Sequence, residues 1–156
     1  MAITNAMCTS FKIEILDGIH AFGPSVVRAA TTADSFRIGL YSSAASLDAA
    51  TTAYTNTNEI TGTGYTNTGV QSTTGQNLAV SQIPIAGPTT TAYVNFTNPQ
   101  WTGATFSADG ALIWNSTQSG KSVAVLSFGG TKTVSSGTFT IQMPTAGTGS
   151  SILQIA

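Results

Sequence analysis

Three runs of strand-forming residues lie close together in the second half of the sequence, the second and third with a period of two, and they constrain its fold more than any other feature. The runs cover 110–115, 121–128 and 138–143. The segments between the first two runs and directly after the second, 116–120 and Gly129 with Gly130, have the composition of turns. Alternation with a period of two is typical of strands. The sequence therefore predicts three consecutive antiparallel strands.

The middle run needs cover on both of its faces. Valines occupy one face of 121–128, and Ala124, Leu126 and Phe128 occupy the other. A sheet that contains such a strand buries both faces only if a second layer packs on it. This indicates a β-sandwich or a barrel.

The N-terminal region has the period of a helix instead. Its apolar residues recur every four positions, which gives one apolar face: Met7, Phe11, Ile15 and Ile19. Gly23 and Pro24 then end the pattern. We predict one domain over 1–156, mainly β, with an amphipathic α-helix at 5–22 and an antiparallel, jelly-roll-like β-sandwich at 35–156.

Further strands are predicted at 35–41, 69–72, 78–85, 91–96 and 151–155. In the first of these, alternate residues are expected to face inward (Phe36, Ile38, Leu40) and outward (Arg37, Gly39, Tyr41).

Residues 55–69 are a different kind of sequence, rich in Thr, Asn and Gly. We expect them to form a long surface loop or an edge hairpin. Long loops in compact domains often carry binding residues, so this segment is a candidate contact region.

Charge is unusually scarce. Only 7% of the 156 residues are charged and the net charge is −1, whereas an ordinary soluble domain has roughly 25% charged residues. Two interpretations stay open: a β-rich secreted or surface domain, or a subunit packed into a large assembly, where buried charge would cost desolvation energy.

The sequence argues against several partner classes. The five basic residues are scattered, and nucleic-acid binding requires a basic stripe. No stretch reaches the roughly 18 apolar residues of a membrane span. The N-terminus lacks the features of a secretory signal, and Cys8 is the one cysteine, so no internal disulfide forms. We expect a protein made in a cytoplasm, without nucleic-acid or membrane partners.

No catalytic constellation is apparent. His20 is the one histidine, and a helix would place it about 18 Å from Cys8 at 1.5 Å per residue. The six acidic residues are scattered, and there is no phosphate-binding loop or serine nucleophile motif. We therefore expect no enzyme activity, no metal site and no cofactor.

Four aromatic residues have two interpretations: Tyr41, Tyr54, Tyr65 and Trp101. They could stack on sugars or on another subunit, or they could pack in the core.

Several segments together point to a family. These are 1–12, 35–43, 58–65, 110–116 and 124–133, which read MAITNAMCTSFK, SFRIGLYSS, NEITGTGY, GALIWNS and AVLSFGGTKT. They resemble a family of small virion structural proteins of tailed bacteriophages, and the similarity covers nearly the whole chain. None of these motifs has catalytic meaning.

The resemblance implies a non-enzymatic component of the virion, assembled in the host cytoplasm. One interpretation is a capsid decoration or cement protein that binds the major capsid protein. The alternative is a tail- or fibre-associated protein, including a glycan-binding module that uses Tyr54, Tyr65 and Trp101. A charge-poor β-protein also suits a homo-oligomer, a dimer or a trimer. Candidate subunit contacts are, on the helix, Met7, Phe11, Ile15 and Ile19, and, in the loop, Glu59 and Tyr65.

Overall fold

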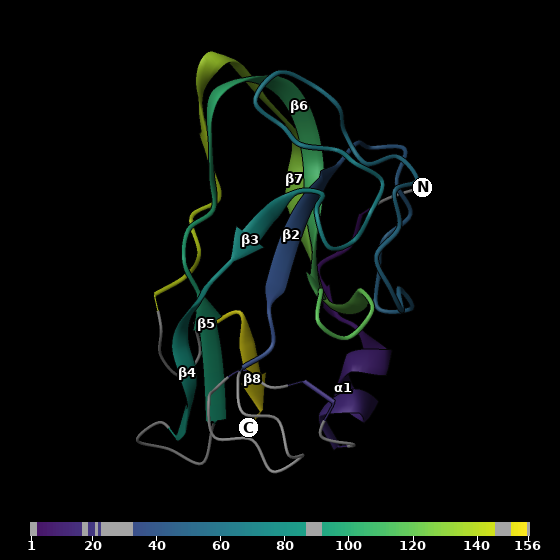
Figure 1. Cartoon of the computed structure of the whole chain (residues 1–156), viewed down its shortest axis with the longest axis vertical. Helices are drawn as coiled ribbons and strands as arrows, with labels where there is room; N and C mark the ends of the chain where they lie inside the picture. The colour runs from purple at the N-terminus through teal and green to yellow at the C-terminus, as the bar shows by residue number, and fades with distance from the viewer. Residues whose placement is uncertain are drawn as a thin grey trace.

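The computed structural model describes residues 3–16, Ile19, His20, Phe22, 33–86, 92–145 and 151–155. Within these residues the chain forms one helix and eight strands: β1 (Ala6–Met7), α1 (Thr9–Leu16), β2 (Phe36–Tyr41), β3 (Gln76–Leu78), β4 (Val80–Ala86), β5 (Ala92–Phe96), β6 (Gln100–Asn115), β7 (Lys121–Thr140) and β8 (Leu153–Ile155). The strands form a five-stranded sheet in the order β1-β7-β6-β2-β3 and a three-stranded sheet in the order β4-β5-β8, shown in Figure 1. All of their pairings are antiparallel. The prediction of a mainly β, sandwich-like fold is confirmed.

β6 and β7 form one long antiparallel ribbon that arches over one end of the molecule (Figure 1). Register shifts interrupt their pairing, and residues with positive φ lie at three of the irregular places: Gly103 (59°), Gly129 (68°) and Ser136 (48°). Bulges of this kind bend and twist a strand without ending it. The ribbon therefore bends while it remains within the five-stranded sheet.

The prediction of three separate strands in this region is wrong. Gly129 and Gly130 lie inside β7, and 138–140 is the end of that strand, while 141–145 has no regular structure. A period of two reveals which residues alternate, but it does not distinguish a bulge from a turn, since both contain glycine.

β2 lies between β6 and β3 in the five-stranded sheet, and both of its faces are covered. The inward prediction is confirmed, because Phe36, Ile38 and Leu40 are at most 2% exposed. The outward prediction is wrong for Tyr41, which is 0% exposed, and for Gly39, which is also buried. On the second face, Gly39 lies against Glu59 and Tyr65 of the long segment between β2 and β3, since a Cβ there would lie 3.1 Å from the side chains of both.

Residues 55–69 contain no regular strand, which agrees with the loop alternative and not with the edge hairpin, but they are only partly a surface loop. Isolated bridges join Glu59 to Tyr41 and Thr63 to Thr105. Glu59, Ile60 and Tyr65 are less than 10% exposed. The segment thus serves as an irregular layer over β2 and β6, which its polar composition did not predict.

The predicted helix over 5–22 is too long. Ala6 and Met7 instead pair with Val125 and Ala124 as the edge strand β1, and α1 ends at Leu16. Residues 17, 18 and 21 lie outside the described part of the chain. A vacant sheet edge offers backbone hydrogen bonds to a passing segment, and this overrides the helical periodicity of the first residues.

The remaining strand predictions are partly right. The segment 78–85 divides between β3 and β4, which belong to different sheets, and 69–72 forms a turn rather than a strand. β5 and β8 lie within the predicted 91–96 and 151–155, although residue 91 is outside the described part. β3 was missed because its Gln76 and Asn77 are polar, and backbone pairing with β2 defines it.

Two groups of aromatic rings fill the core. One lies under the arch of the ribbon and consists of Tyr65, Trp101, Phe106, Phe128 and Phe139, with centroids 5.2–6.4 Å apart. The other joins α1 to both sheets through Phe11, His20, Phe22, Phe36 and Phe96. The helix therefore packs on its own domain through Phe11.

Candidate functional site

A buried carboxylate, Glu59, is the centre of one polar network. Tyr65 donates to Glu59 Oε1 at 2.5 Å, Thr74 donates to the same oxygen at 2.9 Å, and Tyr54 donates to Oε2 at 2.8 Å. We call Glu59, Tyr54, Tyr65 and Thr74 the Glu59 network. Within the described residues no ion pair joins Glu59 to a cation, so its charge is stabilised by hydroxyl groups.

The backbone of the loop positions these groups. Asn58 has a φ of 60°, and its side chain donates to Ala44 O at 3.0 Å, which turns the chain so that Glu59 bridges to Tyr41. Gly39 on β2 gives the carboxylate room, because a Cβ there would lie 3.1 Å from both Glu59 Oε1 and Tyr65 Oη. The network therefore depends on three separate segments.

The tyrosines of this region remain protonated donors. Burial raises the pKa of Tyr65 far above its usual value, and the neighbouring Glu59 charge raises it further. The pKa of Tyr54 is raised by burial and by its hydrogen bond to Glu59, and that of Tyr41 by burial and the same charge. These groups clamp the loop onto the sheet, and none of them is poised as a nucleophile or a base.

A second polar network surrounds His20, which lies beyond the end of α1. Its Nε2 lies 2.7 Å from Glu14 Oε2, and Lys121 Nζ lies 2.6 Å from Glu14 Oε1. On the other side of the ring, Asn115 Nδ2 lies 3.1 Å from His20 Nδ1 and donates to Asp34 Oδ2 at 2.8 Å. We call these five residues the His20 cluster.

Opposing effects act on the titratable groups of the His20 cluster. Burial lowers the pKa of His20, and the hydrogen bond to Glu14 only partly offsets this. Burial raises the pKa of Glu14, but the hydrogen bonds from Lys121 and His20 outweigh it, so the pKa lies below its usual value. The cluster resembles a relay of carboxylate and imidazole, yet the group beyond the imidazole is the Asn115 amide, which is neither a nucleophile nor a base.

Neither network forms a metal centre. In the part of the chain that the structure describes, no three His, Cys, Asp or Glu side chains are arranged to hold a metal ion. Cys8 is 0% exposed, and burial raises the pKa of its thiol. None of the described residues belongs to a helix with the length and apolar character needed to cross a bilayer.

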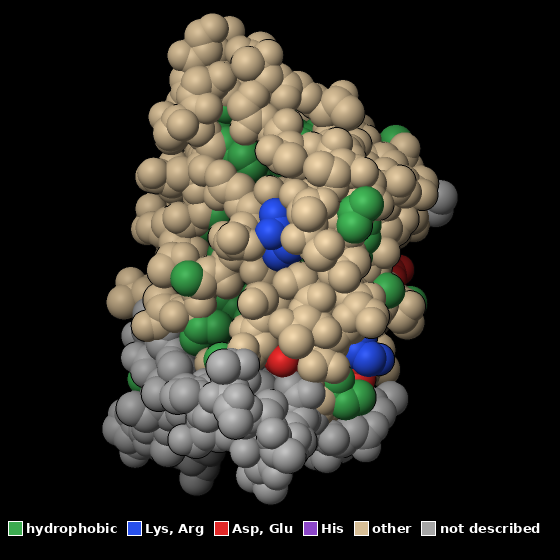
Figure 2. Space-filling model, in the orientation of Figure 1, with side chains coloured by type: hydrophobic (Ala, Val, Ile, Leu, Met, Phe, Trp, Pro, Cys, Tyr) green, Lys and Arg blue, Asp and Glu red, His purple; other side chains and the backbone are tan. Residues whose placement is uncertain are grey.

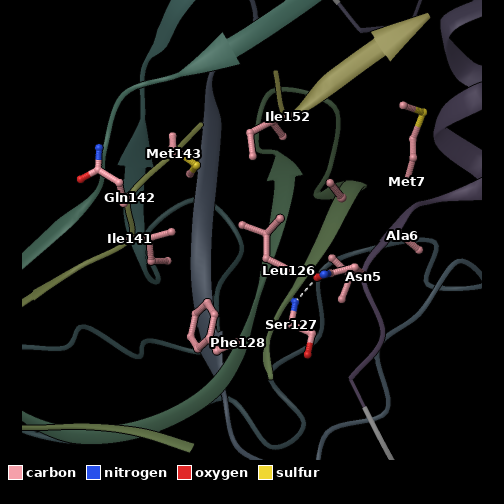
Figure 3. A pocket seen from close by; sticks show the side chains of 12 residues that line it. Asn5, Ala6, Met7, Leu126, Ser127, Phe128, Ile141, Gln142, Met143 and Ile152 are labelled. Carbon is pink, nitrogen blue, oxygen red and sulfur yellow. Dashed lines mark hydrogen bonds between the residues drawn. The ribbon is translucent and has the colours of Figure 1, made fainter. Parts of the chain in front are cut away.

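An apolar groove of about 500 Å³ lies beside β1 and β7, and Figure 3 shows it from close by. Its lining is largely apolar and comes from β1, β7, the segment after β7 and the residue before β8: Met7, Leu126, Phe128, Ile141, Met143 and Ile152. At its margin Asn5 Oδ1 accepts a hydrogen bond from the backbone N–H of Ser127 (Figure 3). Asn5, the residue before β1, thus provides an acceptor for a backbone N–H of β7 next to the stretch that pairs with β1.

Beyond this point no strand of the described residues pairs with the outer edge of β7. In the described part of the chain, β1 is the strand that pairs with this edge, and it does so at Val125 and Ala124. Residues 129–140 are mostly exposed and pair with β6 on their other side. We call 129–140 the open edge.

The structure places the six candidate contact residues in different environments. Phe11 is fully buried, Glu59 and Tyr65 are 8% and 9% exposed, and the others, Met7, Ile15 and Ile19, are half-buried. Of these, the structure brings together Glu59 and Tyr65, and it places Met7 in the wall of the groove. Their role as subunit contacts stays a prediction, and the buried three are accessible only if the loop or the helix moves.

The aromatic residues considered for sugar stacking are mainly part of the core. Tyr41, Tyr65 and Trp101 are 0%, 9% and 2% exposed. Tyr54 is half-buried against Trp114, with ring centroids 4.7 Å apart. A stacking platform built from Tyr54, Tyr65 and Trp101 is therefore not present on the surface.

Sequence reasoning missed the partners of both buried networks. Thr74 is one of many threonines, and no spacing marks it or Tyr54 as a partner of Glu59. Asn115 lies 95 positions from His20. One signal was available in retrospect: an acidic residue in a segment so poor in charge suggests a specific partner for Glu59.

A scan against protein-family models, a search of curated proteins and a search of solved structures each find no match.

Proposed function

We propose that this chain is a non-enzymatic structural protein of a tailed-phage particle, a capsid cement or decoration protein that binds the major capsid protein and stabilises the head lattice. The proposed protein acts in the virion as a homo-oligomer, a dimer or a trimer. Its sequence motifs resemble those of small phage virion proteins, and its surface chemistry supports the same assignment.

The observation that carries the proposal is the lack of charge at the surface. Three of the six acidic residues, Glu14, Asp34 and Glu59, are buried. In the described part of the chain, Asp48 and Asp109 are the acidic side chains that remain outside the core. The face in Figure 2 accordingly consists mainly of uncharged polar side chains and backbone, with isolated charged groups.

Such a surface favours lasting contact with other proteins. Thr, Ser and Gly can be buried at an interface without the large desolvation cost of charged groups. A free monomer, in contrast, usually relies on charge for solubility. A subunit that is packed between capsid proteins needs few charged residues for solubility.

The test is quantitative mass spectrometry of purified virions. A capsid cement protein is expected at a copy number comparable to that of the major capsid protein. A small fraction of that copy number would assign the protein to the tail or the fibres, and absence from the particle would contradict any virion role.

A further inference from the structure

The open edge of β7 contains one short regular stretch, 131–135. Gly129 and Gly130 have φ values of 68° and 135°, and Ser136 has a φ of 48°, so irregular backbone lies on both sides. Between them, Lys132, Thr133 and Val134 pair in unbroken register with Ala108, Ser107 and Phe106 of β6. A partner strand could therefore add to the sheet along this stretch.

Lys132 is the one charged residue of the open edge. Within the described part of the chain no carboxylate forms an ion pair with it. The carboxylate of Asp109, on the opposite strand, accepts a hydrogen bond from Thr131 Oγ1 at 2.7 Å instead. The ammonium group is thus left for solvent or for a partner.

The cross-strand neighbours of Lys132 show on which face of the ribbon it lies. Residues opposite each other in a sheet share one face, and Lys132 is opposite Ala108, which is 0% exposed, while Val134 is opposite Phe106, which is 6% exposed. Lys132 therefore shares a face of the ribbon with buried Ala108, while its own side chain is exposed at the rim. A lysine on an edge strand is a known means of preventing edge-to-edge pairing.

Pairing between two copies of this stretch would bring like charges together. An antiparallel pair centred on Lys132 places the two ammonium groups opposite each other, and a pair centred on Thr133 places each one next to Val134 of the other copy, where it loses water. Like charges directly opposite each other destabilise a sheet, whereas opposite charges stabilise it. A strand with an Asp or Glu opposite Lys132 would meet neither penalty.

We infer that Lys132 makes the open edge of β7 selective: it prevents two copies of this chain from pairing along 131–135 and admits an extended partner strand that presents a carboxylate opposite it. This inference rests on the proposed function in one respect, since the acidic strand belongs to another protein of the particle. The homo-oligomer then forms through other surfaces.

The purified chain tests this inference, with the variant Lys132→Glu as the acidic partner strand. Sedimentation velocity at low salt measures the mass of wild type, of Lys132→Glu and of their equimolar mixture. We expect each protein alone to have the mass of the wild-type homo-oligomer and the mixture to form a heavier complex, which dissociates at high salt because the attraction is electrostatic. Lys132→Thr alone is expected to exceed the wild-type mass at high concentration.

Thr61→Glu, an exposed position outside the ribbon, is the matched control for a change of net charge and should leave the mass unchanged alone and in mixtures. Circular dichroism confirms that each variant folds; Lys132→Asp replaces Lys132→Glu, and Lys132→Gln replaces Lys132→Thr, if either does not. If Lys132→Thr has the wild-type mass at every concentration, Lys132 does not prevent two copies from pairing. If the mixture forms no complex, the edge does not select an acidic partner strand. Absence from virions overturns the proposed function and leaves this solution result intact, so the two failures are distinguishable.

Discussion

Tyr65 donates its hydroxyl proton to Glu59 Oε1 across 2.5 Å and, through the same hydroxyl oxygen, accepts the backbone N–H of Leu40 at 2.9 Å. One side chain therefore links the carboxylate of the loop to the backbone of β2. Because all three groups are buried, each of them depends on the others for a hydrogen-bond partner.

Replacing Glu59 by Ala should lower the free energy of unfolding by about 1–3 kcal/mol, because the hydroxyls of Tyr54, Tyr65 and Thr74 lose their acceptor in a buried site. Urea unfolding followed by circular dichroism measures the change. Asp48→Ala, at an exposed position, is the control and should change stability much less. Equal stability of the Glu59→Ala and wild-type proteins would contradict a structural role for the network.

Gly39→Ala should also destabilise the protein, by about 1–3 kcal/mol, as small-to-large changes in packed cores do. The added Cβ would lie 3.0 Å from Trp114 Cζ3 and 3.1 Å from Glu59 Oε1. Ser43→Ala, on the exposed turn after β2, is a control in which nothing buried changes. If Gly39→Ala were as stable as wild type by urea unfolding, the loop would pack less closely on β2 than described.

The His20 cluster should make stability depend on pH. Burial holds the pKa of folded His20 below its ordinary value of 6.5, so as the pH falls below 6.5 the unfolded chain binds the proton first. Stability is therefore complete above this pH and declines below it, with a slope of at most about 1.4 kcal/mol per pH unit for one proton. Urea unfolding between pH 5 and 8 measures the slope.

His20→Gln is the control for this prediction and should flatten the profile in that range. The pKa of Glu14 is lowered relative to 4.5, so its contribution is lost only at more acid pH. An unchanged slope in His20→Gln would show that other groups cause the pH dependence.

Both tryptophans should be protected from solvent in the folded protein. Trp101 and Trp114 are 2% and 0% exposed, so their fluorescence should be blue-shifted and weakly quenched by acrylamide, and unfolding in urea should reverse both properties. Efficient quenching of the folded protein would mean that an indole lies at the surface, as the sugar-stacking interpretation of Trp101 requires.

Cys8 should not react with a thiol reagent in the folded state. Its side chain is fully buried, and burial raises the pKa of the thiol, which decreases the fraction of reactive thiolate. Ellman's reagent should detect one thiol after denaturation and almost none before it. Rapid reaction of the native protein would place Cys8 at the surface.

The sequence by itself determined the fold class and the strands at the centre of the five-stranded sheet. The alternation in 121–128 is a local property, since successive side chains of a strand point to opposite faces whatever their partner is. The apolar run 110–115 is equally local. The same holds for the inward residues of β2. The low content of charged residues was likewise apparent from the composition alone.

The tertiary structure alone decided which segments cover these strands and which polar groups meet. Thr74 reaches Glu59 across 15 positions and Asn115 reaches His20 across 95, and no local pattern encodes such pairs. Ala6 and Met7 continue a helical period in the sequence, yet they form a strand because β7 offers them an unpaired edge. Any segment that packs against a strand can provide backbone hydrogen bonds and bury its side chains. The partners of each strand and polar group therefore become defined only when the whole chain has folded.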